Sequence, residues 1–514
     1  MIALLAAAVP LPPLLAVLWI GVGVVLGVNR GETGEPQTAR VAVGAATLSL
    51  LSVLALDAIA VVSAIPGQVR LGTWLSSGTI EVALAFTLDP FGLAMATLVT
   101  LICLVTLRFS VGYMHRERGF QRFFLGLSLF TGGMLLIVTA GNAVLTFVGW
   151  ELAGISSYLL IAYAYDRPQA TENATRAFVT NRIGDGGFLL AIFLCFSWIG
   201  STEWPALAAG TAGLDRLRAG LILLGFTLAA LAKSAQVPFA PWIARALEGP
   251  TPSSAVFYGS LMVHAGVYLL IRLAPLFQQA PSLMLLLAAV GTLTVLYGWL
   301  SGLTQADVKS SLMFSATAQV GLMVLWCGLG WFELAAWHLG LHAWWRAYQF
   351  LHAPALMHAV SRPARPAPAW LARQRRLYTA ALQRFWLDPI ADWLLVRPTS
   401  QLARDVQAFD DEVVDRLVGL PSVGAVASTA DSEQGQKGLT DERGTAGRGI
   451  LGSTMEWLAN LLHWFEERLV LKGGGEGLLA GLRQLGGYLQ QIEELLSMPR
   501  YLILLIVATF VVIL

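Results

Sequence analysis

Residues 147–161 read FVGWELAGISSYLLI and place Glu151 inside an apolar run that is long enough to cross a bilayer. Two later apolar runs also contain charged residues: NRIGD at 181–185 and AKSAQVP at 232–238. A charge at the centre of a bilayer costs roughly 3 kcal/mol on insertion scales. Because acidic and basic side chains recur on successive spans despite this cost, the pattern predicts that ions move through the membrane along these segments.

The composition is typical of a membrane protein with many spans. Hydrophobic residues make up 56% of the 514 residues and charged residues 13%, whereas a soluble domain has about 25% charged residues. The net charge of +1 provides no basic face, so no nucleic-acid partner is expected. The three cysteines lie in apolar runs and form neither a metal-ligand nor a disulfide pattern: Cys103, Cys195 and Cys327. The N-terminus lacks the basic region of a signal peptide, so its apolar run is expected to open a span.

We expect an all-α fold, a polytopic membrane bundle of about 12 transmembrane helices with broken helices and an amphipathic helical tail on the cytoplasmic side. The apolar runs predict spans near 2–28, 41–65, 90–112, 121–140, 142–164, 176–199, 218–240, 251–273, 282–301, 309–328, 333–358 and 498–514. Between the second and third spans, Val69 to Leu88 alternates in polarity and contains turn residues, which predicts a β-hairpin on the outer face.

The chain is expected to divide into a membrane domain and a tail. The predicted parts are a transmembrane domain of about 11 helices at 1–358, a connector with a lateral amphipathic helix at 359–420, a flexible linker at 421–452, amphipathic helices at 453–497 and a terminal transmembrane helix at 498–514. Arginines gather in the loops after the third and eleventh spans. The positive-inside rule therefore places the N-terminus outside and region 359–497 in the cytoplasm, with the chain in the inner membrane of a bacterial cell.

Three charged residues near the middle of the chain are candidates for proton transfer. Arg182 and Asp185 are three positions apart on one helical face, so they can pair with each other. They belong either to a proton path or to a self-satisfied intrahelical ion pair. Glu151 likewise belongs to the path or lies at a helix entry in contact with water.

Lys233 is one of only four lysines in a chain that is rich in arginine. Lysine, unlike arginine, can lose its proton when it is desolvated. We expect its helix to continue to about residue 240, where Pro238 and Pro241 break it and free backbone carbonyls. In the alternative interpretation, the lysine extends to the membrane surface. A carboxylate that moved toward or away from Lys233 would change the affinity of the lysine for its proton.

A second polar group lies further along the chain. The eleventh span carries His338, His342 and Arg346, each four positions apart and therefore on one helical face, and the eighth span carries His264. A chain of imidazoles that ends on a fixed positive charge suits proton relay, although a lone histidine such as His264 is often a structural donor. Lys309, at the start of the tenth span, either takes part or extends to the membrane surface.

No cofactor and no metal are expected. The histidines lack the HExxH pattern and the cysteine partner that would favour zinc. The sequence contains no phosphate loop, no dinucleotide fingerprint and no cysteine cluster for iron–sulfur binding. The chain is therefore expected to carry no redox centre of its own.

Several motifs, in order, resemble those of one known family. They are LDPFG at 88–92, FVGWELAGISSYLLI at 147–161, RIGD at 182–185, KSAQVPF at 233–239, GPTPSSA at 249–255 and DVKSSL at 307–312. Over residues 60–360 the chain resembles the large antiporter-like subunit of respiratory complex I, subunit L, which is related to Mrp-type sodium/proton antiporters. The resemblance implies a proton channel in which Glu151 and Lys233 form a charged pair, Asp185 modulates the pair, and His338 and His342 relay protons.

The chain departs from the family pattern at several places. Tyr258 stands where the family commonly has a histidine, and Arg346 stands where a relay lysine follows the paired histidines. Because arginine does not readily release its proton, we expect the second half of the channel to be altered. The spans of the family that follow the eleventh are not found, and residues 385–417 resemble the region that comes after those spans.

The leading hypothesis is a proton-translocating membrane subunit of a complex-I-like assembly, with other membrane subunits as partners. One alternative is the energy-coupling channel of a DAB-type inorganic carbon uptake complex, which would have a large zinc-containing, carbonic-anhydrase-like partner. Two further alternatives are a sodium/proton antiporter subunit and a structural scaffold with an inactive channel.

Overall fold

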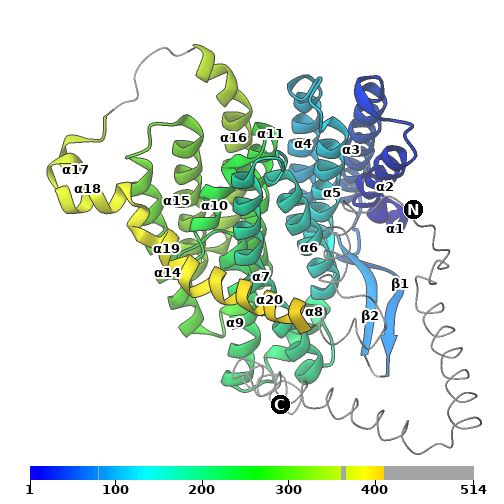
Figure 1. Cartoon of the computed structure of the whole chain (residues 1–514). Helices are drawn as coiled ribbons and strands as arrows, with labels where there is room; N and C mark the ends of the chain where they lie inside the picture. Colours follow the sequence, from blue (N-terminus) through cyan, green and yellow to red (C-terminus); the bar gives the residue numbers. More distant parts are fainter. Residues whose placement is uncertain (79, 360–365, 410–514) are drawn as a thin grey trace, which may run out of the picture. The chain divides into compact units, whose positions relative to one another are not determined.

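The computed structural model describes residues 1–78, 80–359 and 366–409 (Figure 1). The chain divides into two compact units, Met1–Arg397 and Pro398–Leu514. In the first unit, long helices run side by side and a two-stranded sheet accompanies them, which confirms the expected all-α membrane bundle. Of the second unit only 398–409 are described, so the predicted parts at 421–452, 453–497 and 498–514 lie outside the described residues.

The elements alternate between long helices and short irregular ones. The first half contains α1 (Ile2–Ala7), α2 (Leu11–Val25), α3 (Gly31–Val62), β1 (Gln68–Ser77), β2 (Ile80–Thr87), α4 (Pro90–Tyr113), α5 (Phe120–Thr139), α6 (Ala143–Ile161), α7 (Pro168–Ile199), α8 (Trp204–Thr211) and α9 (Arg216–Lys233). The second half contains α10 (Pro241–Arg245), η1 (Ala246–Glu248), α11 (Thr251–Ser254), η2 (Ala255–Ser260), α12 (Met262–Arg272), α13 (Ala274–Phe277), α14 (Pro281–Gly302), α15 (Val308–Gly328) and α16 (Phe332–Ala359). The tail begins with α17 (Ala369–Arg373), α18 (Arg375–Leu382), η3 (Arg384–Trp386), α19 (Leu387–Ala391), η4 (Asp392–Val396) and α20 (Arg397–Phe409).

Within the described residues, eight helical stretches are long and apolar enough to cross a membrane: α3, α4, α5, α6, α7, the stretch from α11 to α12, α14 and α15. The span expected at 2–28 is instead two shorter helices, because Pro10, Pro12 and Pro13 cluster at the start of α2. The span expected at 251–273 is interrupted by the π-helical turn η2. Broken helices were expected, and such interruptions are common at functional sites.

The burial pattern separates central helices from outer ones. Nearly every residue of α5 and of the α11–α12 stretch is buried. In contrast, α3 exposes Leu48 and Leu51, and α14 exposes Leu285 and Leu293. Exposed leucines on helices of this length are typical of contact with lipid.

The expected hairpin is present as the antiparallel pair β1 and β2, with Gln68 opposite Thr87 and Ser77 opposite Ile80. It lies near the junction of α5 and α6, where Phe86 forms a bridge with Ala140 (Figure 1). Beyond the hairpin, Asp89 caps α4 by accepting from Gly92 N at 3.0 Å. The guanidinium of Arg272 binds both carboxylate oxygens of Asp89, at 2.5 and 3.0 Å. This bidentate ion pair ties the end of α12 to the start of α4.

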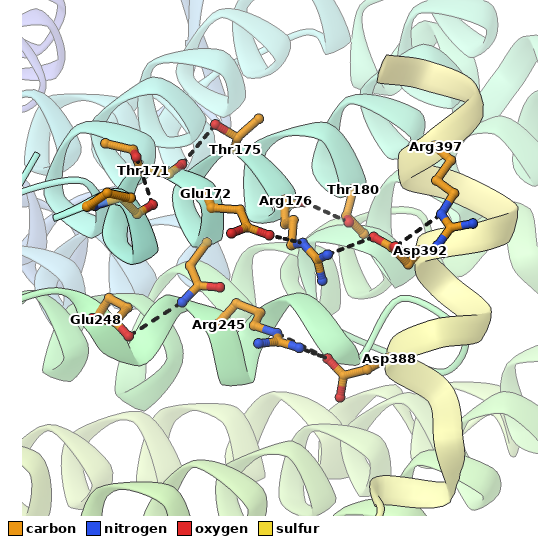
Figure 2. Close-up of polar contacts among 12 residues, drawn as sticks. Thr171, Glu172, Thr175, Arg176, Thr180, Arg245, Glu248, Asp388, Asp392 and Arg397 are labelled. Atoms are coloured by element: carbon orange, nitrogen blue, oxygen red, sulfur yellow. Dashed lines mark hydrogen bonds and ion pairs between the residues drawn. The ribbon is translucent and has the colours of Figure 1, made fainter. Parts of the chain in front are cut away.

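The tail segment from η3 to η4 belongs to the first unit and is bound to α7 and α10 of that unit by two aspartates one helical turn apart. Figure 2 shows Asp388 against Arg245 of α10 and Asp392 against Arg176 of α7. The closest distances are 3.1 Å from Arg245 Nη2 to Asp388 Oδ1 and 3.3 Å from Arg176 Nη2 to Asp392 Oδ1. The lateral amphipathic helix is expected at 385–417; Phe385 and Trp386 have positive φ angles, and helical structure then runs without a break from Leu387 to Phe409, with a π-helical turn at Asp392–Val396. Its residues beyond 409 lie outside the described part of the chain.

Candidate functional site

The first charged cluster joins α6 and α7. Asp185 is buried, with 4% of its side chain exposed, and Arg182 Nη2 lies 2.8 Å from Asp185 Oδ2. The Nη1 atom of Arg182 donates to Glu151 Oε2 of α6. Arg182 therefore bridges carboxylates from two helices, in addition to forming the intrahelical pair that the spacing predicted.

The glycines of α7 allow α9 to approach this cluster closely. A Cβ on Gly184 would lie 2.5 Å from the Cβ of Ala232, and a Cβ on Gly187 would lie 2.9 Å from the carbonyl oxygen of Gly225. Gly186, between them, faces open space. Small residues at such positions let two helix backbones come together, and the approach brings Asp185 to the end of α9.

The helix that carries the lysine ends at Lys233, so the expected continuation to about residue 240 is wrong. Gln236 N donates to the carbonyl oxygen of Leu231 at 2.9 Å, and Ala235 has a φ of 51°. This is the hydrogen-bonding pattern of a Schellman helix end. The helix does break in this region as predicted, but it ends in the turn at residues 234–236, before it reaches Pro238.

The ammonium group of Lys233 is enclosed by protein, with 1% of the side chain exposed, so it does not extend to a surface. Its Nζ lies 4.0 Å from Asp185 Oδ1, and it donates to the carbonyl oxygen of Trp150 at 3.3 Å. Nζ also lies 5.0 Å from the centre of the Trp150 ring, within cation–π range. The indole N–H of Trp150 in turn donates to Asp185 Oδ1 at 2.8 Å.

Trp150 is therefore a site residue that the sequence analysis did not single out. It contacts the acid through its indole N–H and the base through its ring and its backbone carbonyl. The signal available in the sequence was its position directly before Glu151 in an apolar run. An indole nitrogen buried in a span needs an acceptor, and a nearby carboxylate is a suitable one.

Glu151 and Lys233 belong to one cluster but do not form the direct pair that the family resemblance implies. Within the described residues, no ion pair shorter than 4 Å joins them, because Arg182 takes the Glu151 carboxylate. Gly154 borders both cations: a Cβ there would lie 3.1 Å from Arg182 Nη2 and 3.5 Å from Lys233 Nζ. Glu151 and Lys233 are thus connected through Arg182 and Asp185.

The second cluster joins α12, α15 and α16 through histidines. His264 Nε2 lies 2.9 Å from His342 Nδ1, and Arg346 Nε donates to His342 Nε2 at 3.1 Å. His338 Nε2 lies 2.9 Å from Gln319 Oε1, and its ring centre lies 5.9 Å from that of His342. The helical spacing of the α16 residues predicted their common face. That His264 and Gln319 meet them from α12 and α15 was not predicted.

Two residues of interest in the sequence lie outside both clusters. Lys309 is partly buried in the first turn of α15, next to the capping residue Asp307, which accepts from Ser310 N at 2.7 Å. Tyr258 is fully buried in η2, where its hydroxyl group donates to the carbonyl oxygen of Ala246 at 3.3 Å and contacts Ser254. In the described part of the chain, no three His, Cys, Asp or Glu side chains gather as a metal site would require.

The turn after Lys233 lies between the two clusters. Ser234 packs against α12, since a Cβ on Gly266 would lie 2.3 Å from Ser234 Oγ. Val237 N donates to Thr294 Oγ1 of α14 at 3.0 Å. Among the residues described, Ser234 Oγ, Gln236 Oε1 and His264 Nδ1 are buried without a hydrogen-bond partner. Buried polar atoms of this kind are the sites at which an internal water can bind.

Two family models match the chain. Residues 140–383 match the model described as NADH:quinone oxidoreductase/Mrp antiporter, TM, and residues 74–124 match the model described as NADH-Ubiquinone oxidoreductase (complex I), chain 5 N-terminus. Both charged clusters lie within 140–383. These matches confirm the resemblance inferred from the sequence motifs.

Similar curated proteins are subunits of quinone oxidoreductases. NADH-quinone oxidoreductase subunit L of Mycobacterium tuberculosis is 40% identical over 290 residues, which cover 56% of this chain and 46% of that protein. NADH-ubiquinone oxidoreductase chain 5 of Allomyces macrogynus is 38% identical over 295 residues, which cover 57% of this chain and 46% of that protein. The chain thus spans about half the length of the curated relatives that it matches.

Two solved structures have a similar fold. One is the Mrp complex from Dietzia sp. DQ12-45-1b, with a TM-score of 0.60 and 22% identity, covering 100% of this chain and 63% of that one. The other is the membrane-bound sulfane sulfur reductase, an archaeal respiratory membrane complex, with a TM-score of 0.60 and 19% identity, covering 90% of this chain and 94% of that one. At these identities the likeness is one of fold.

Proposed function

Because this chain belongs to the family of NADH:quinone oxidoreductase and Mrp antiporter membrane subunits, we propose that it moves protons across the membrane within a multisubunit assembly. The observation that carries the proposal is the cluster of Glu151, Arg182, Asp185 and Lys233 on three neighbouring helices, in which Asp185 and Lys233 are buried and Glu151 and Arg182 partly buried. Ionisable groups inside a membrane protein are expensive, and they commonly mark ion pathways. The histidine cluster beyond the 234–237 turn supplies further groups of the kind that relay protons.

The arrangement supports a specific division of roles. Lys233 is held by a carbonyl oxygen and an aromatic face, and its nearest carboxylate oxygen is 4.0 Å away, at the limit of an ion pair. A small displacement of Arg182 would change how strongly the negative charges of Asp185 and Glu151 interact with the ammonium group of the lysine. The affinity of Lys233 for its proton would change with it, so Lys233 is the proton carrier and Arg182 the charge that moves.

The test is proton uptake by vesicles that contain the chain together with its natural partner subunits. Lys233→Ala and Lys233→Arg are both expected to abolish transport, because arginine keeps the charge but does not release its proton. Arg218→Gln is the matched control, since Arg218 lies at the other end of α9 and is 55% exposed beside Asp215. Full transport by Lys233→Ala would refute the proposal and leave the scaffold interpretation.

Identification by mass of the proteins that purify with the chain distinguishes the remaining assemblies. Subunits of a quinone oxidoreductase would support the complex-I-like assignment. A large zinc-containing, carbonic-anhydrase-like protein would indicate inorganic carbon uptake instead, and transport that requires sodium would indicate an antiporter. We place the chain in the cytoplasmic membrane of a bacterium with its N-terminus outside, an orientation that labelling of single cysteines on either side can test.

A further inference from the structure

The hydrogen bonds of Arg346 fix the direction of the hydrogen bonds that join Arg346, His342 and His264. Arg346 is buried, with 7% exposed, and donates to Gln349 Oε1 at 2.9 Å, to His342 Nε2 at 3.1 Å and to Ser315 Oγ. A guanidinium group has five N–H donors and no acceptor. The Nε2 atom of His342 must therefore be the acceptor, and it carries no proton while this contact exists.

The acceptor role of His342 Nε2 also determines where the protons of His342 and His264 are. A neutral imidazole has one N–H and one bare nitrogen, so His342 carries its proton on Nδ1. That N–H faces His264 Nε2 at 2.9 Å and donates to it. His264 Nε2 is then an acceptor, and its own proton is on Nδ1, which is buried without a partner among the described residues. All of these hydrogen bonds run in one direction, from Arg346 through His342 to His264.

We propose that Arg346 is a positioning residue that locks His342 and His264 in the Nδ1–H tautomer and so closes this pair of histidines to protons at both ends. A proton can enter a chain of imidazoles only at a bare nitrogen. At one end of the pair, His264 Nδ1 already carries a proton. On the opposite side, the bare nitrogen of His342 is covered by an arginine that does not give up its own proton.

The lock opens when Arg346 moves away from His342. A proton could then bind His342 Nε2, the Nδ1 proton of His342 would pass to His264 Nε2, and the Nδ1 proton of His264 would leave into the interior. One proton enters and one leaves, and both rings finish in the Nε2–H tautomer. The role of this lock rests on the proposed proton transport. The tautomers themselves can be measured without a transport assay.

The groups around His342 come from three helices. His264 of α12 and His338 and Arg346 of α16 contact the His342 ring, while Ser315 and Gln319 of α15 bind Arg346 and His338. His338 donates from Nε2 to the amide oxygen of Gln319, so it must be in the opposite tautomer, independently of Arg346. It therefore serves as an internal control.

The experiment is nitrogen-15 magnetic resonance of the full chain in lipid bilayers with its seven histidines labelled, where N–H and bare ring nitrogens give well-separated signals. Signals are assigned by single His→Asn variants. In the wild type we expect Nδ1–H for His264 and His342 and Nε2–H for His338. In Arg346→Met, which removes all donors at similar length, we expect Nε2–H signals to appear for His264 and His342, with His338 unchanged.

An Nε2–H tautomer of His342 in the wild type would overturn the lock, and this result does not depend on whether Arg346→Met folds. Unchanged tautomers in a folded Arg346→Met would also overturn it. If the tautomers are as expected while vesicles show no proton transport, the lock stands and the proposed function fails. If they are as expected and Arg346→Met increases passive proton conductance above that of the wild type, both are supported.

Discussion

The contact between Trp150 and Asp185 makes a prediction about stability that needs no transport assay. Replacement of Trp150 by phenylalanine keeps an aromatic face for Lys233 but removes the indole N–H that donates to Asp185 at 2.8 Å. Asp185 is almost fully buried, so water does not replace the lost donor. The change therefore isolates one charge-assisted hydrogen bond in the centre of the bundle.

The magnitude follows from the kind of bond. A buried hydrogen bond to a charged group contributes about 1.5–3 kcal/mol. A double-mutant cycle of Trp150→Phe with Asp185→Ala is expected to give a coupling energy of about that size, because the two side chains are in direct contact. The matched control is Trp242→Phe: Trp242 is 3% exposed and donates instead to the backbone carbonyl of Ala232 at 2.9 Å. Its cycle with Asp185→Ala should couple by less than about 0.5 kcal/mol.

The assay is the free energy of unfolding in mixed micelles, measured for the wild type, the single variants and the double variants. The control cycle removes the loss of ring volume that is common to both tryptophans. A coupling below about 0.5 kcal/mol between Trp150 and Asp185, with both singles destabilised, would refute the role of Trp150 as the partner of Asp185.

Three further outcomes are expected. Gly187→Val should lower stability by about 1–3 kcal/mol by forcing α7 from α9, whereas Gly186→Ala, in open space, should be neutral or slightly stabilising in a thermal denaturation series. Arg272→Ala removes a partly buried bidentate ion pair and should cost about 1.5–3 kcal/mol; Arg70→Ala, which breaks an ion pair that is more than half exposed, should stay within about 0.5 kcal/mol, and equal effects would contradict the burial argument. Asp392→Asn should weaken the attachment of the tail segment, with a salt-dependent loss of stability of no more than about 1 kcal/mol. The loss should be seen as faster proteolysis of the tail, and an unchanged cleavage rate would count against this contact.

The motifs, read in order, were enough to identify the fold class and the family. Apolar runs near 20 residues have few solutions in a bilayer, because every backbone polar group must be satisfied within a helix. The same constraint explains why Glu151, Asp185 and Lys233 stood out: charges in such runs need partners. The i, i+3 spacing of Arg182 and Asp185 was also sufficient to predict their ion pair, since helix geometry alone brings these positions together.

The sequence by itself therefore determined which charged residues lie in apolar runs and which of them share a helical face. Only the tertiary structure decided which helices meet. Arg182 rather than Lys233 takes the Glu151 carboxylate, Trp150 joins the acid to the base, and His264 meets His342 across 78 positions of the chain. The physical reason is that hydropathy and periodicity report the environment of one helix, whereas partner choice depends on close approaches such as that of Gly187 to Gly225, which no local pattern specifies.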